Sequence, residues 1–128
     1  ADLERLRKRR KAIDRHLWDP VRGAYYAFHL DRKKRVRALS ADTFVPLWAG
    51  IASRRQSAGV MGKALPQLEK PGGIMSSTIT GSIHQWDGNN GWAPFHIFAA
   101  EGAIRTGHEE AGRRIAKKWV DTLSLIHI

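Results

Sequence analysis

The residues best suited to chemistry lie together in one glycine-rich segment. Its sequence is Gln85-Trp86-Asp87-Gly88-Asn89-Asn90-Gly91-Trp92-Ala93-Pro94. An indole ring offers a flat apolar face that stacks on the C–H face of a pyranose, while amide and carboxylate groups can bond the ring hydroxyls. The candidate sugar-binding residues are therefore Gln85, Trp86, Asp87 and Trp92.

The same segment also fits a purely structural turn in front of a helix. Gly88 and Gly91 tolerate unusual φ values, and asparagine side chains bond their own backbone in turns. Pro94 suits the first turn of a helix, where the N–H that it lacks would be unpaired anyway. Taken alone, the segment leaves both interpretations open, because short motifs often occur by chance.

The segment resembles the signature of the inverting α,α-trehalases, a family of glycoside hydrolases. In that signature Gln-Trp-Asp and a short turn precede Gly-Trp-x-Pro, and both tryptophans of this chain fall in register. The family usually has proline where this chain has Asn89, and commonly glutamine where it has His96. The similarity spans roughly residues 12–122 and is carried by residues 23–31, 40–50, 72–77, 101–102 and 115–119.

The resemblance implies hydrolysis of the disaccharide trehalose to two glucoses with inversion, by a monomeric parent enzyme without a metal or organic cofactor. Inversion needs two carboxyl groups about 6.5–9.5 Å apart, one protonated and one that activates water. The family's catalytic acid is an Asp upstream of this segment, and its base is a Glu in a Glu-Lys-Tyr-like stretch beyond it. The resemblance thus places no catalytic residue in this chain, which we expect to be inactive alone. Asp87 then fixes the loop or contacts the sugar.

The fold implied by the resemblance is all-α. Trehalases of this family form an α/α toroid of six helical hairpins, several times longer than this chain of 128 residues. Residues 1–122 are therefore expected to be a fragment of that catalytic domain. Residues 123–128 depart from the family pattern and match the translation of a transposon-derived sequencing adapter, so we expect this tail to be non-native.

Hydrophobic spacing and turn residues predict helices at residues 2–17, 41–53, 55–68, 93–106 and 109–122. One short β-hairpin is predicted between residues 24 and 39, around the polar turn 31–34. Residues 70–91 are rich in Gly, Ser and Thr and have no helical period, which predicts a long loop of the functional kind.

Several other residues are expected to be structural rather than functional. Glu101 is expected to be a buried glutamate paired with an arginine. Ser76 and Ser77 are expected to be loop hydroxyls rather than nucleophiles. The aromatic residues expected in the core are Tyr25, Tyr26, Phe28, Phe44 and Trp48.

The chain is strongly basic, with a formal net charge of +10 and a pI near 10.7. The alternative function is therefore a small basic helical module that binds nucleic acid or another acidic partner. The basic runs, at residues 5–11, 32–37 and 113–118, fall on expected helix faces or a turn. No aromatic residue interleaves them as a stacking platform requires, so solvated charge explains them better and we expect no nucleic-acid partner.

Composition also limits the possible metal and membrane sites. Cysteine is absent, which excludes disulfides and cysteine-based metal sites. The six histidines show no metal-binding spacing, so no metal site is expected. No apolar stretch approaches the roughly 18 residues that span a bilayer, and we expect no membrane partner. The compartment stays open between cytoplasm and periplasm or secretion.

Overall fold

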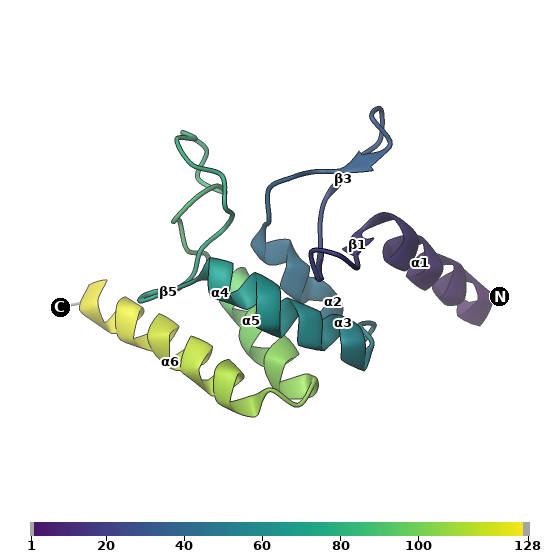
Figure 1. The fold of residues 1–128 in the computed structure, drawn as a ribbon. Helices are drawn as coiled ribbons and strands as arrows, with labels where there is room; N and C mark the ends of the chain where they lie inside the picture. Colours follow the sequence, from purple (N-terminus) through teal and green to yellow (C-terminus); the bar gives the residue numbers. More distant parts are fainter. Residues whose placement is uncertain (1, 127–128) are drawn as a thin grey trace.

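The protein is mainly helical in a computed structural model that describes residues 2–126 (Figure 1). Helix α1 (Asp2–His16) lies at one end and has no buried residue, although Ile13 packs against the core. Acidic residues in its first turn and basic residues in its last turn suit the helix dipole. The helix predicted at residues 2–17 is confirmed.

The short strands pair as two-stranded antiparallel hairpins. They are β1 (Trp18–Asp19) with β2 (Ala24–Tyr25), β3 (Phe28–His29) with β4 (Lys34–Arg35), and β5 (Glu69–Lys70) with β6 (Gly73–Ile74). The pair β3–β4 confirms the predicted hairpin around the polar turn. The prediction of a single hairpin was wrong, because strands of two residues are too short to show an alternating pattern.

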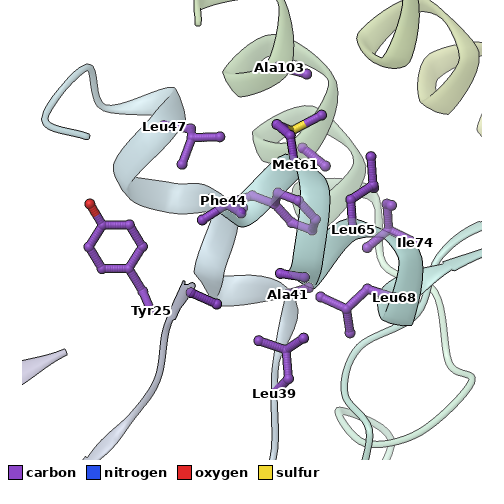
Figure 2. Packing of buried hydrophobic residues seen from close by; sticks show 14 of the residues in the cluster. Tyr25, Leu39, Ala41, Phe44, Leu47, Met61, Leu65, Leu68, Ile74 and Ala103 are labelled. Atoms are coloured by element: carbon purple, nitrogen blue, oxygen red, sulfur yellow. The ribbon is translucent and has the colours of Figure 1, made fainter. Parts of the chain in front are cut away.

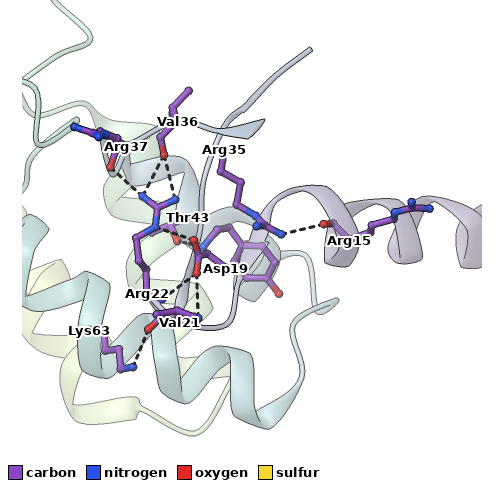
Figure 3. A network of polar contacts seen from close by, with 10 residues as sticks. Arg15, Asp19, Val21, Arg22, Arg35, Val36, Arg37, Thr43 and Lys63 are labelled. Atoms are coloured by element: carbon purple, nitrogen blue, oxygen red, sulfur yellow. Dashed lines mark hydrogen bonds and ion pairs between the residues drawn. The ribbon is translucent and has the colours of Figure 1, made fainter. Parts of the chain in front are cut away.

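Arg22 holds the first two hairpins together (Figure 3). Its guanidinium donates to the Asp19 carboxylate at 2.8 Å and to the carbonyl oxygens of Val36 and Arg37 at 3.1 Å. The same group lies 3.4 Å from the centroid of the Tyr26 ring. The backbone N–H of Arg22 also donates to Asp19, and this bond is the main reason why the pKa of Asp19 lies below its usual value.

The helix predicted at residues 41–53 is shorter than expected. A 3-10 turn, η1 (Ala41–Phe44), leads into α2 (Val45–Trp48), and Gly50 then turns the chain away at a φ of +70°. Ser53 caps the next helix through a reciprocal capping box with Gln56. The turn at Gly50 therefore follows the end of α2, and the Ser53 cap begins the next helix.

The helix predicted at residues 55–68 is confirmed as a continuous helical segment. It runs from α3 (Arg54–Gly59) through the π-helical η2 (Val60–Ala64) to α4 (Leu65–Leu68). In the π segment Leu65 donates to the carbonyl of Val60, five residues back. The next residue is Pro66, which has no N–H to continue the α-helical ladder.

Helices α5 (Ala93–Arg105) and α6 (Glu109–Ile126) form a helical hairpin (Figure 1). Gly107 turns the chain between them at a φ of +87°. Gly112 lets the helices approach closely, since a Cβ at that position would lie 2.6 Å from the carbonyl oxygen of Ala100. The two predicted helices are confirmed.

The last helix extends further than expected. The prediction ended it at residue 122, whereas α6 continues to Ile126. Residues 127–128 lie outside the described residues. The expectation that residues 123–128 are non-native stays a prediction.

The core is built around Phe44, which is fully buried (Figure 2). The same buried cluster includes Leu47 of α2, Leu65 and Leu68 of α4, Ile74 of β6 and Ala103 of α5. Tyr25 and Tyr26 are buried as predicted, while Phe28 and Trp48 are only half-buried. Two core residues lie at the base of the long loop: Ile74 directly precedes it, and the backbone of Leu39 bonds Thr78 within it.

Candidate functional site

The long loop, residues 75–92, projects from the helical body on the same side as the β3–β4 hairpin (Figure 1). Leu39 anchors its base, because Leu39 accepts from the backbone N–H of Thr78 at 2.9 Å and donates to the Thr78 hydroxyl at 3.0 Å. The predicted loop at residues 70–91 is confirmed from Met75 onward, whereas its first residues belong to the β5–β6 hairpin.

Trp86 and Trp92 form a stacked pair in this loop. Their ring centroids are 4.3 Å apart with an interplanar angle of 20°, and Phe95 meets Trp86 edge-on at 5.9 Å. The indole N–H of Trp92 donates to the carbonyl of Gln85 at 2.8 Å. Trp86 remains 51% exposed, so part of its indole surface is open to a ligand ring.

The Asp87 carboxylate braces the loop. One oxygen accepts from the Ser82 hydroxyl at 2.8 Å and the other from the Ser77 hydroxyl at 3.3 Å. The side chain is half-buried, whereas Gln85 beside it is exposed. Of the two roles expected for Asp87, these contacts support loop fixing. A sugar contact by Asp87 or Gln85 stays a prediction.

Ser76 and Ser77 bond the backbone of the aromatic turn, and are loop hydroxyls as predicted. The hydroxyl of Ser76 donates to the carbonyl of Asn90 at 2.6 Å, and its backbone N–H donates to the same oxygen at 2.9 Å. The hydroxyl of Ser77 accepts from the N–H of Gly88 at 3.1 Å. The two serines therefore fix the backbone between the two tryptophans.

His96 is a buried residue whose role the sequence did not indicate. Its Nε2 accepts from the backbone N–H of Ile74 at 2.8 Å, and its Nδ1 lies 2.7 Å from the carbonyl oxygen of Trp92. The ring stacks on Trp119 at 3.9 Å and is 3% exposed. Burial lowers the pKa of His96, which favours the neutral ring.

Glu101 differs from the expectation of a buried glutamate. Its side chain is 53% exposed, and its carboxylate accepts from the indole N–H of Trp48 at 2.8 Å. Arg105 is present, as expected, but its guanidinium lies 4.0 Å away on the same helix face. Glu101 therefore ties α5 to α2 at the surface through an indole rather than through an arginine.

Across residues 2–126 no group of three or more His, Asp or Glu is placed to hold a metal ion. None of the described helices is long and apolar enough to cross a membrane. Basic residues often pair along exposed helix faces, as in the pairs Lys8–Glu4, Arg113–Glu109 and Lys117–Asp121.

Comparison with known proteins connects this geometry to one family. The family model described as Trehalase matches residues 3–127. The cytosolic neutral trehalase of Neurospora crassa is 40% identical over 124 residues, covering 91% of this chain and 17% of that protein. The cytosolic neutral trehalase of Kluyveromyces lactis is 37% identical over 128 residues, covering 93% and 17%. This chain thus spans about 17% of the length of these two curated relatives.

A solved structure agrees with the sequence relatives. The neutral trehalase Nth1 from Saccharomyces cerevisiae matches with a TM-score of 0.83 at 35% identity, covering 91% of this chain and 22% of that chain. The helical hairpins with short β-hairpins correspond to part of an α/α toroid. A family model that covers nearly the whole chain, together with these relatives, shows that the chain belongs to the trehalase family.

Proposed function

We propose that this chain is one segment of an α,α-trehalase and supplies part of the sugar-facing rim of the active site. The observation that carries the proposal is the Trp86–Trp92 stack, which is partly exposed on a braced loop. An exposed indole can stack on one glucose ring of trehalose. The exposed side chain of Gln85 stands beside it to bond ring hydroxyls.

The parent reaction in this proposal is inverting hydrolysis of trehalose to two glucoses. One carboxylic acid protonates the glycosidic oxygen while a carboxylate on the opposite face activates a water molecule, the two being about 6.5–9.5 Å apart. Both carboxyl groups come from outside this chain, and neither a metal nor an organic cofactor takes part. The parent acts as a monomer. This segment alone binds and orients sugar but cannot hydrolyse it.

A segment exchange tests the proposal. Residues 3–122 of this chain would replace the matching segment of the Neurospora crassa neutral trehalase, to which the chain is 40% identical. We expect the chimera to hydrolyse trehalose and this chain alone to release no glucose. Proton NMR of the first products should show equal amounts of α- and β-glucose, because inversion changes the configuration at only one of the two anomeric carbons.

The matched control is the same exchange made with the Kluyveromyces lactis segment. A folded but inactive chimera beside an active control would show that this chain does not serve as a trehalase segment. Glucose release by the isolated chain that is abolished by Asp87→Ala would show instead that a catalytic carboxylate lies within it.

A further inference from the structure

His96 connects three parts of the chain. It bonds Ile74 in the segment before the long loop, it bonds the carbonyl of Trp92 where the loop ends, and it stacks on Trp119 of α6. Both hydrogen bonds are satisfied by only one form of the ring. Nδ1 carries the hydrogen and donates to Trp92, while Nε2 is bare and accepts from Ile74.

The bond to Ile74 reaches the aromatic turn through the next residues of the chain. Two residues after Ile74, Ser76 donates twice to the carbonyl of Asn90. The other bond of His96 fixes the backbone of Trp92, two residues after Asn90. The imidazole therefore sets the separation between the segment that supports the turn and the tryptophan that ends it.

From this geometry we infer that His96 is the positioning residue of the Trp86–Trp92 stack. Its ring acts through Trp92 and the 74–76 segment and touches no sugar. The importance of the stack for trehalose rests on the proposed function, whereas the positioning of the stack does not. Gly73 makes room for the ring, since a Cβ there would overlap Nε2 of His96.

Four titratable groups near His96 could influence its protonation. Lys70 lines the same hollow of about 450 Å³ as His96 and Trp119. Glu69, on the neighbouring strand, is paired with Arg114 and Lys118 of α6. His84 and Asp87 lie in the loop above. All of these groups are kept in a variant that changes His96 alone.

Protonation is a direct probe of the proposed role. Adding a proton to Nε2 places a hydrogen against the N–H of Ile74, so this bond is lost while the bond to Trp92 is kept. A buried N–H left unpaired in this way destabilises the stacked arrangement of Trp86 and Trp92. The fraction of molecules in which the two rings are not stacked should therefore rise about 5-fold to about 150-fold. Glutamine at this position can accept and donate like the neutral ring, but it does not titrate in this range.

The test uses NMR of the full chain and of two variants, His96→Gln and His96→Leu. The readout is the ring-current shift of the Trp86 and Trp92 protons, assigned with Trp86→Phe and followed from about pH 7.5 to about pH 4.5. Long-range nitrogen–proton spectra should show hydrogen on Nδ1 and none on Nε2 at the higher pH. We expect His96→Leu to lose the ring-current shift and His96→Gln to keep it. Acid should reduce the shift in the unchanged chain but not in His96→Gln.

Three results would overturn the inference. They are a stack that persists in His96→Leu, a stack that is lost equally in His96→Gln, and an identical acid response in His96→Gln and the unchanged chain. If His96→Leu unfolds the whole chain, the inference is decided by comparing the acid response of His96→Gln with that of the unchanged chain.

A separate titration of the unchanged chain with trehalose tests the proposed function. An intact stack whose Trp86 signals do not shift on addition of trehalose would count against the proposed function and not against the positioning role of His96.

Discussion

The hydroxyl of Ser82 donates a 2.8 Å hydrogen bond to the carboxylate of Asp87, five residues further along the chain. The other oxygen of the same carboxylate accepts from Ser77. Asp87 therefore joins two earlier positions of the long loop, Ser77 and Ser82, to the aromatic turn. We predict that Asp87→Ala loosens the loop and costs about 1–3 kcal/mol of folding free energy. Urea unfolding and amide hydrogen exchange across residues 77–90 measure both effects.

The matched control for this change is Asp31→Ala. Asp31 is an exposed aspartate on the turn of the β3–β4 hairpin, so its removal should change stability by less than about 0.5 kcal/mol. Exchange rates in the long loop should stay as they are. Equal effects of the two substitutions would mean that the carboxylate of Asp87 does not brace the loop.

The tryptophan pair should matter more for sugar than the basic helix does. In the active chimera, Trp86→Ala or Trp92→Ala should each lower kcat/KM for trehalose, since stacking contributes about 0.5–1.5 kcal/mol beyond burial, or about 2-fold to 12-fold. A contact that strengthens as the ring distorts lowers kcat as well as raising KM. Steady-state kinetics with near-UV circular dichroism check the effect and the fold.

Charge reversal on α1 is the control for the tryptophan variants. Arg7→Glu and Lys11→Glu alter exposed side chains on a helix without buried residues, so kcat/KM should remain nearly unchanged. If the tryptophan variants are folded and keep the parental kinetics, residues 85–94 form a purely structural turn and do not bind sugar. A larger loss from charge reversal than from the tryptophans would favour the basic binding module.

A side chain at position 73 should destabilise the fold. The φ of Gly73 is +130° and a Cβ would overlap Nε2 of His96, so Gly73→Ala should cost about 2–4 kcal/mol from strain and displacement. Gly50→Ala is the control, because Gly50 has a φ of +70° with no atom near the added Cβ, and should cost about 1–2 kcal/mol. Urea midpoints of the two variants give the comparison. Equal losses of stability in Gly73→Ala and Gly50→Ala would show that the His96 ring adds no steric cost at position 73.

Acid should destabilise the chain through Glu69. The hydrogen bond from Arg114 is the main reason why the pKa of Glu69 lies below its usual 4.5, with a second bond from Lys118. The unfolded chain therefore binds the proton more readily, so this contribution to stability is present above pH 4.5 and is lost as pH falls through the lower folded value. Unfolding free energies measured by urea at several pH values test this.

The variant Glu69→Gln should remove this part of the acid response. It should also cost about 2 kcal/mol at neutral pH, because Lys118 and Arg114 lose their partner at a carboxylate that is only 13% exposed. Glu109→Gln is the control, since its pair with Arg113 is exposed and should contribute less than about 1 kcal/mol. A Glu69→Gln protein with an unchanged pH profile would contradict the assignment.

Several helices and the long loop could be predicted from the sequence because their signals are local. The apolar spacing of α1 and α6 and the proline and glycine at the ends of α5 lie within the elements themselves. The lack of a helical period likewise marked residues 70–91 as a loop. The shorter end of α2 and the hairpins β1–β2 and β5–β6 were missed, because strands of two residues and a single glycine turn carry little pattern.

The sequence by itself determined the family, because the motifs that resemble it are continuous segments spread over roughly residues 12–122 and can be read along the chain. Only the tertiary structure decided how the segment of Trp86 and Trp92 is held. The partners of His96 lie at Ile74 and Trp119, and the partner of Glu101 is Trp48, 53 residues away. Hydrogen bonds and stacking join whatever the fold brings within a few ångströms, so distance along the chain does not reveal them.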